Sequence, residues 1–436
     1  MTHEENELLC RVNPGSALHE PLSRYWYPVL RSEKLKDRHT AKVRLLGENF
    51  VVARRGDELI ALEEHCPHRQ ASLVLARVED GGLRCLYHGW VMDRDGRVKE
   101  TPNEKEAGGR DRLRIRAPGV REAGGLIWLN MGLKEEERAP FPDFVWMKLP
   151  PENVVITDVM QATNWIQALE GSIDSSHSTT LHQEEILGSG STDSSTVISK
   201  PGEAVQFARP SLDKHPRISV RDTDFGFIYG ALRRPIKNPE AQVYVRATAF
   251  AFPGYVTFPL SATLRVLLVF VPIDDTHGRF LSIWYSMTGP LDRAGRIAWS
   301  GLDPDKDLDE EGYLKRCALP QWGQDREAMV AGKSFAGMRG INVQDTVVQE
   351  SMGPIVDRTR EHLGPADLAI VHFRRLFLAL ARGEGPAADP KFASRLTYKG
   401  LLARDGLVPV DQDWSTLYGD DEVNWAGRSE RSAEAA

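Results

Sequence analysis

The sequence predicts an α+β protein in which a small N-terminal β domain precedes a larger domain of mixed helices and strands. Three observations support this fold class. Short β-like segments broken by turns fill the chain from about Tyr25 to Leu133, a charged and then proline-rich stretch follows from residue 134 to 151, and long apolar strands and helical patterns lie beyond it. At 436 residues, the length also favours two or three domains.

The elements expected in the first domain are strands at Val43–Leu46, Phe50–Ala53, Glu58–Ala61 and Leu126–Asn130. In the second domain, strands are expected at Gly226–Gly230, Val243–Phe250 and Leu264–Val271, and a helix is expected between Pro365 and Gly383. We place the domains at 25–135 and 136–425. Residues 1–24 are expected to pack on the larger domain, and residues 426–436 to form a disordered tail.

Composition excludes several function classes. The net charge is −7 and no dense basic run occurs, so nucleic-acid binding is not expected. The segment Met1 to Cys10 is polar and acidic, unlike a secretory signal. The longest apolar run, Val266 to Ile273, is far shorter than the roughly 20 residues that cross a bilayer. We therefore expect a cytoplasmic protein without a membrane partner, in which Cys10 and Cys317 are packing residues.

Two short motifs each place one cysteine near one histidine: Cys66-x-His68 and Cys85-x-x-His88. Structural zinc sites usually use paired C-x₂₋₄-C and H-x₃₋₅-H ligands, which this pattern lacks. It fits a [2Fe–2S] cluster in which two cysteines hold one iron and two histidines hold the other. We predict that these four residues bind such a cluster between two loops at hairpin tips, and that the adjacent His65 is structural.

A second group of candidate ligands lies beyond the domain boundary, in the segment Asp174-x₂-His177-x₄-His182. The stretch from Gln161 to Leu187 begins with a helical pattern and then fills with serine and threonine. In a regular helix five residues advance roughly 500°, so the two histidines would lie about 140° apart. A π-bulge, or a break between two short helices, would let both reach one metal. Two histidines and one carboxylate form the facial triad of O₂-activating Fe(II) enzymes.

The motifs Cys66-Pro-His-Arg and Cys85-x-x-His-Gly-Trp, and the order of the segments, resemble the Rieske non-haem iron ring-hydroxylating oxygenases, in particular the phthalate dioxygenase-like branch. The resemblance implies an oxygenase (alpha) component with an all-β Rieske [2Fe–2S] domain. A catalytic α+β domain would follow, with helices flanking an antiparallel sheet in a helix-grip-like fold. It also implies that Asp345 is the third ligand of a mononuclear Fe(II), with Glu350 and Asp357 as nearby alternatives.

The resemblance further gives Asp174 a role as an electron-transfer bridge between subunits, on a path from His88 of one chain to Asp174 and His177 of the next. It implies a trimer, or a hexamer of two stacked trimers. Electrons from NAD(P)H would arrive through a separate reductase, with or without a ferredoxin, since the chain has no flavin or nicotinamide fingerprint. From the residues alone, Asp174 could equally be a helix N-cap.

The expected reaction uses O₂ to hydroxylate or O-demethylate an aromatic compound, most simply one with a carboxylate. Arg209 and Arg246 are the candidates for binding that carboxylate, because a guanidinium suits it in charge and shape. Either arginine could instead be a surface residue or a structural ion pair. Two other functions remain open at this level: a Rieske electron carrier without oxygenase activity, and a zinc-stabilised binding module.

Overall fold

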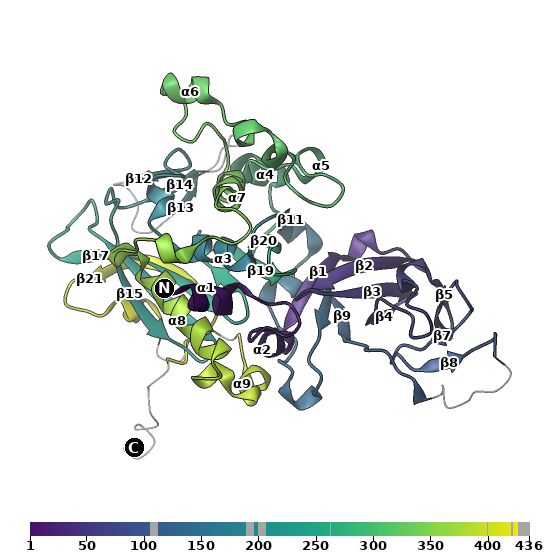
Figure 1. Ribbon diagram of the computed structural model, residues 1–436. Helices are drawn as coiled ribbons and strands as arrows, with labels where there is room; N and C mark the ends of the chain where they lie inside the picture. The colour runs from purple at the N-terminus through teal and green to yellow at the C-terminus, as the bar shows by residue number, and fades with distance from the viewer. Residues whose placement is uncertain are drawn as a thin grey trace, which may run out of the picture.

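The computed structural model describes residues 1–104, 112–188, 196–198, 206–261, 263–398, 400–419 and 422–425. The chain forms a smaller lobe of strands and a larger lobe of strands and helices (Figure 1). The predicted C-terminal tail at 426–436 lies outside the described residues. Among the described helices, none has the length and apolar character needed to cross a membrane.

Within the described residues, the smaller lobe consists of three small antiparallel sheets. Their strands are, in sheet order, β2 (Thr40–Leu45), β3 (Glu48–Arg55) and β4 (Glu58–Glu63); β5 (Arg77–Glu79), β6 (Gly82–Arg84), β7 (Val91–Met92) and β8 (Val98–Glu100); and β1 (Trp26–Arg31), β10 (Leu126–Asn130) and β9 (Gly119–Ala123). The first two sheets enclose their own apolar core, which includes both Cys66 and Cys85. The third sheet belongs to the core of the larger lobe, so β1, β9 and β10 join the two lobes.

The larger lobe is built on a sheet that has eight strands within the described residues. Its order is β11 (Val154–Gln161), β20 (Gly278–Ser286), β19 (Leu264–Pro272), β18 (Tyr255–Thr257), β17 (Gln242–Ala251), β16 (Gly226–Arg233) and β15 (Arg217–Asp222), with β21 (Arg404–Pro409) paired to β17. All these pairings are antiparallel. The α+β class predicted from the sequence is therefore confirmed.

A second, three-stranded sheet contributes one of the functional strands. It consists of β12 (Ile186–Gly188), β14 (Gln206–Arg209) and β13 (Thr196–Ile198). In Figure 1 it lies beside the upper edge of the larger lobe, near the helices α4 (Arg293–Ser300), α5 (Pro304–Asp307), α6 (Arg326–Val330) and α7 (Ile341–Ser351).

Helices cover the large sheet and attach the N-terminus to it. The helix α3 (Trp165–Ile173) packs on β19 and β20, and α8 (Leu368–Ala381) packs on β15. The remaining helices are α1 (His3–Cys10), α2 (His19–Ser23) and α9 (Pro390–Arg395). The α1 helix contacts α8, and the Asn6 side-chain amide donates to the carbonyl of Val356 at 3.0 Å.

The helix expected from Gln161 onward begins later than predicted. Gln161 is the last residue of β11 and pairs with Gly278, so it belongs to the sheet. The helix begins only at Trp165, where the Asn164 side chain accepts a hydrogen bond from the Ile166 N–H as an N-cap. The helical pattern is real, but strand pairing takes Gln161, and the N-cap at Asn164 sets where the helix begins.

Candidate metal centres and active site

The two Cys–His loops lie at the far end of the smaller lobe, and each is closed by its own backbone hydrogen bonds. The Gln70 N–H donates to the Cys66 carbonyl at 2.9 Å, and the Gly89 N–H donates to the Cys85 carbonyl at 3.0 Å. The second loop is the tip of the β6–β7 hairpin, as expected. The first is closed by a single antiparallel bridge between His65 and Ser72, which gives His65 a place in the backbone framework of the loop.

A glycine is required after the second motif. Gly89 has a φ of +75°, which favours glycine, and a Cβ there would lie 2.7 Å from Cγ of Pro102. The chain can therefore turn back beside the 98–104 segment only if this residue lacks a side chain. The Cys85 and His88 side chains are positioned by this turn.

The four side chains of the two motifs face one another. The thiols of Cys66 and Cys85 are buried, and the rings of His68 and His88 are 4.4 Å apart between centroids. Burial and the neighbouring Cys85 thiol raise the pKa of Cys66 to about 11. The Nδ1 atom of His88 is buried and has no hydrogen-bond partner. Two thiols and two imidazoles, one with an unused buried nitrogen, fit the ligand set of a [2Fe–2S] cluster.

The second candidate centre depends on a break in the helix, one of the two distortions that the sequence allowed. The α3 helix ends at Ile173, and Asp174 is extended at φ −89° and ψ 114°. The chain then makes a single 3₁₀ turn over His177–Thr179 and continues to His182. This break places the two Nε2 atoms 3.2 Å apart, where a regular helix would have separated them.

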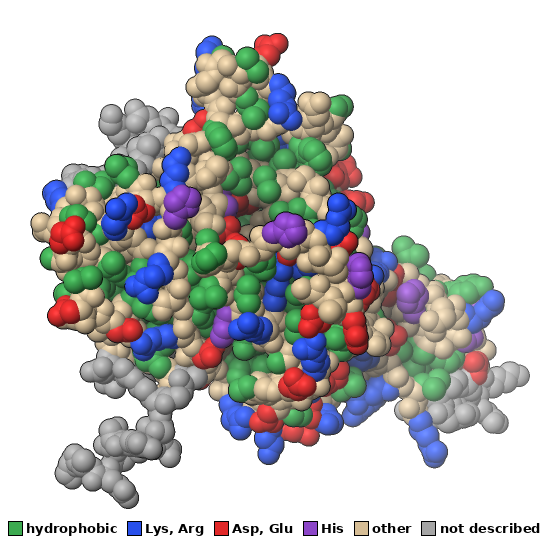
Figure 2. Space-filling model, turned by 60° about the vertical axis from the view of Figure 1, so that its left-hand side comes forward, with side chains coloured by type: hydrophobic (Ala, Val, Ile, Leu, Met, Phe, Trp, Pro, Cys, Tyr) green, Lys and Arg blue, Asp and Glu red, His purple; other side chains and the backbone are tan. Residues whose placement is uncertain are grey.

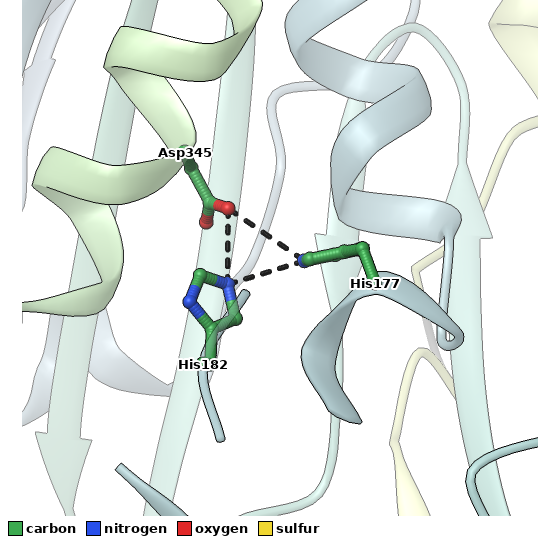
Figure 3. A group of neighbouring side chains, drawn as sticks. All are labelled: His177, His182 and Asp345. Atoms are coloured by element: carbon green, nitrogen blue, oxygen red, sulfur yellow. Dashed lines mark hydrogen bonds and ion pairs between the residues drawn. The ribbon is translucent and has the colours of Figure 1, made fainter. Parts of the chain in front are cut away.

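Asp345 completes this group from a different helix. Its Oδ1 atom lies 3.0 Å from Nε2 of His182 and 3.6 Å from Nε2 of His177. Figure 3 shows the three side chains converging, with Asp345 reaching in from α7. Burial opposes the charge of Asp345, but the two imidazoles lower its pKa. A carboxylate and two imidazole nitrogens pointing at one small space fit a divalent metal ion.

The two alternative carboxylates lie elsewhere. Glu350 accepts a hydrogen bond from the Ala162 N–H at 3.0 Å. Asp357 accepts hydrogen bonds from the backbone and side chain of Thr359, in a turn of its own. Among the described residues, the one group of three or more potential ligands close enough to share a metal is His177, His182 and Asp345.

Gln344 orients His182, a role that the sequence analysis did not assign. Its Nε2 atom donates to the Met338 carbonyl at 2.9 Å, so its Oε1 atom faces Nδ1 of His182 at 2.7 Å. Because this oxygen accepts a hydrogen bond from Nδ1–H, the Nε2 atom of His182 keeps its lone pair, which is directed at Asp345 and His177. The sequence gives only a weak signal for this role, because Gln344 is marked by nothing except its place next to the proposed ligand Asp345.

Asp174 contacts the backbone of the same turn that carries His177. Its carboxylate accepts hydrogen bonds from Ser176 N–H at 2.7 Å and Ser176 Oγ at 2.6 Å. Its Oδ2 atom lies 3.3 Å from Nδ1 of His177. Burial opposes the charge, but His177 and Ser176 lower the pKa of Asp174 to about 2. The carboxylate therefore acts as a cap for the turn and at the same time lies against an imidazole of the candidate metal centre.

The two arginines predicted for substrate binding both lie in the larger lobe. Arg209 ends β14 and is buried, and its Nη2 atom is 3.4 Å from the Ser178 hydroxyl. Arg246 lies on β17 and its guanidinium covers the ring of Phe258 at 5.0 Å. Phe258 lines a small cavity together with Asp345 and Trp299. Figure 2 shows a hollow in the upper part of one face of the larger lobe.

The chain is similar to known proteins over nearly its whole length. The family described as the Rieske [2Fe-2S] domain matches residues 25–118, and the family described as LigXa C-terminal domain like matches residues 129–434. The phthalate 4,5-dioxygenase oxygenase subunit of Pseudomonas putida is 36% identical over 95% of this chain and 94% of its own length. The 5,5'-dehydrodivanillate O-demethylase oxygenase subunit of a Sphingobium species is 31% identical over 89% of this chain and 83% of its own length.

Solved structures show the same fold. That of Pseudomonas putida CBB5 NdmA, as the QL mutant with caffeine, superposes with a TM-score of 0.59 at 18% identity. The superposition covers 92% of this chain and 100% of the other.

Proposed function

The chain belongs to the Rieske oxygenase family, and from that premise we propose that it is the oxygenase subunit of a multicomponent enzyme that oxidises an aromatic acid with O₂. The observation that carries this proposal is the presence of two different donor sets in one chain. One set has two cysteines and two histidines in facing loops, and the other has two histidines and a carboxylate. A plain electron carrier has no use for the second set.

The cofactors of the family are a [2Fe–2S] cluster and a mononuclear Fe(II). Cys66, His68, Cys85 and His88 would hold the first, and His177, His182 and Asp345 the second. When bound, the cluster supplies single electrons and the mononuclear iron activates O₂. The protein itself orients the donors: Gln344 fixes the tautomer of His182, and the break after Ile173 brings the two imidazoles together.

Substrate binding is assigned to Arg209 and Arg246. A guanidinium attracts a carboxylate, and its planar fork fixes the orientation of the attached ring. The Phe258 ring under Arg246 also lines a small cavity that reaches Asp345. A carboxylate held by the two arginines would direct the aromatic ring towards Asp345, and ring hydroxylation and O-demethylation are both compatible with that position.

The position of the cluster loops supports a proposal for the assembly. Leu86 and Tyr87, between the second cysteine and histidine, have 60% and 55% of their surface exposed, so a partner surface would cover them. We assign this surface to a neighbouring subunit of a trimer or a stacked pair of trimers. Asp174 would carry electrons from the partner's cluster to His177. A separate reductase, with or without a ferredoxin, would supply electrons from NAD(P)H, in a cytoplasmic setting.

The test is O₂ uptake by the iron-loaded protein with a generic Rieske reductase, across phthalates, methoxybenzoates and biaryl lignin acids. A product heavier by two oxygens and two hydrogens identifies a dihydroxylating enzyme. Formaldehyde with loss of a methyl group identifies an O-demethylase. Electron transfer through the cluster without substrate-dependent uptake for any aromatic acid would favour the electron carrier and contradict the proposal.

A further inference from the structure

A third arginine lies beside the two that the sequence identified. Arg233 is the last residue of β16 and pairs with Tyr244 of β17, while Arg246 pairs with Ala231. Because paired residues share a face of the sheet and residues two apart do so as well, Arg233 and Arg246 lie on the same face. Arg209 and Arg233 contact the same short segment, through Ser178 and Ser175. Burial, Arg233 and then Arg246 lower the pKa of Arg209 to about 9.

Arg233 and Arg209 are deeply buried but incompletely paired. Only 2% of Arg233 and 4% of Arg209 is exposed. In the part of the chain that the structure describes, the Nε and Nη1 atoms of Arg233 and the Nη1 atom of Arg209 are buried without a hydrogen-bond partner. Asp405 raises the pKa of Arg209 and Asp213 raises the pKa of Arg233, but each effect is smaller than the lowering caused by burial. Asp213 is itself hydrogen-bonded to Arg234.

A second pair of buried arginines shows what structural pairing looks like in this protein. Arg358 and Arg374 both contact the carboxylate of Glu170, at 3.0 and 2.7 Å. Arg374 also reaches Glu361. Burying a cation without a carboxylate partner is costly. Arg296, whose donors are also unused among the described residues, stacks on the ring of Trp284 instead. The neighbouring unused donors of Arg209 and Arg233 therefore support a site for an anion that binds there.

Arg233 also holds the turn that carries His177. Its Nη2 atom donates to the Ser175 carbonyl at 3.1 Å and to the Ser175 hydroxyl at 3.3 Å. Arg209 contacts Ser178 on the other side of His177. The same two guanidiniums that have unused donors are therefore attached to both ends of the short segment in which the candidate metal ligand lies.

We propose that Arg233 is a positioning residue of the substrate site. Its free donors meet the carboxylate held by Arg209 and Arg246, and its Nη2 atom holds Ser175. Carboxylate binding and metal binding at His177 are therefore coupled. The inference rests on the proposed function, since it takes an aromatic carboxylate as the anion. An anion that draws the Arg233 guanidinium into one position also fixes the Ser175 end of the turn. Carboxylate and metal then each favour the same arrangement, and the coupling must be reciprocal.

The test is calorimetric titration with phthalate, and with benzoate as the monoanionic probe, of the full-length protein with its cluster intact. Each titration is made with the mononuclear site stripped by chelator and again after loading with Zn²⁺, so no turnover is involved. In the wild type we expect Zn²⁺ to tighten phthalate binding about tenfold, within the usual range of coupling between sites. Phthalate should tighten Zn²⁺ binding by the same factor.

Two variants and a matched control decide the role of Arg233. R233Q should weaken phthalate binding at least tenfold and bring the coupling factor close to one. R233K keeps the charge, so it should retain part of the affinity but lose the coupling. The control is R217Q, which removes the same charge from an exposed residue of the neighbouring strand β15. It should match the wild type.

Circular dichroism and the cluster absorption verify that each variant folds. If R233Q does not fold, the result for R233K decides the role of Arg233.

The outcomes separate this inference from the proposed function. Wild-type affinity and coupling in R233K or R233Q would overturn the role of Arg233 and leave the oxygenase assignment standing. Equal loss in R217Q would reduce the effect to net charge and would overturn the inference as well. Failure of the wild type to bind either acid would instead overturn the carboxylate assignment itself.

Discussion

The two candidate metal centres are assembled in opposite ways. The four donors of the cluster site come from residues 66–88, on two loops that close with their own backbone hydrogen bonds. The mononuclear site joins a turn after α3 to the α7 helix, and 162 positions separate His182 from Gln344, which orients it. The first site is therefore specified locally, and the second depends on the packing of distant elements.

The largest effect should come from breaking the local site. C85S removes one of two buried thiols, and because a hydroxyl is a poor ligand for iron, the cluster should be absent and turnover should be abolished. Visible absorption and EPR of the reduced protein measure this loss. C317S is the control, since Cys317 lies far from the loops in sequence and in the other lobe. An intact cluster spectrum in C85S would exclude Cys85 as a ligand.

The corresponding change in the second site is H182A. Losing one of three protein ligands should remove the mononuclear iron and reduce turnover at least 100-fold, while the cluster spectrum stays unchanged. Metal analysis combined with EPR separates the two irons. If H182A lost both metals together, the two centres would not be independent and the comparison would be wrong.

D174N tests the connection between the two sites. The amide keeps the size of the side chain but removes the charge beside His177. Both metals should stay bound, since Asp174 is outside the group of metal ligands, yet turnover should fall by two orders of magnitude or more. Normal steady-state activity in D174N would rule out the bridge and leave Asp174 as a cap for the turn.

A smaller effect is expected for Q344A, which leaves all proposed ligands in place. Without the acceptor at 2.7 Å, the His182 ring loses its fixed tautomer, and such outer partners typically contribute 10–100-fold in metal affinity. Competition with a chelator measures the metal affinity of the mononuclear site. The cluster content is the internal reference and should not change.

Acidification should affect the larger lobe through Glu170. Burial opposes its charge, but Arg358 and Arg374 lower its pKa below the ordinary value of 4.5. The stabilisation that this provides is therefore complete above pH 4.5 and is lost as the pH falls through the lowered pKa, by about 1.4 kcal/mol for each unit of the shift. Chemical unfolding at several pH values measures the loss, and E170Q should abolish this pH dependence.

The same contrast, between a site built from local loops and a site built from distant elements, decides what could be predicted from the sequence. The motifs at Cys66 and Cys85 predicted the cluster site from spacing alone, because both loops are local. The histidine pair predicted a distortion of the helix, either a π-bulge or a break, and a break occurs after Ile173. Asp345 could be chosen over Glu350 only by family resemblance, because nothing in the spacing of α7 shows which carboxylate faces the turn.

Other features could not be predicted because they depend on packing. Gln344 has no distinguishing sequence context beyond its neighbour. Arg233 ends an apolar strand in which every residue is buried, and only the pairing of β16 with β17 places it beside Arg246. Gln161 was assigned to a helix because its pairing with β20 could not be seen in the sequence.

The central claim is that this chain uses both sites to insert oxygen into an aromatic acid. A single-turnover experiment tests it most directly, because chemically reduced protein needs no reductase. The protein is mixed with phthalates, methoxybenzoates or biaryl lignin acids under ¹⁸O₂, and the products are analysed by mass spectrometry. We predict ¹⁸O in a hydroxylated ring, or loss of a methyl group as formaldehyde, together with oxidation of the cluster. Oxidation of the cluster without a labelled or demethylated product from any of these acids would contradict the claim.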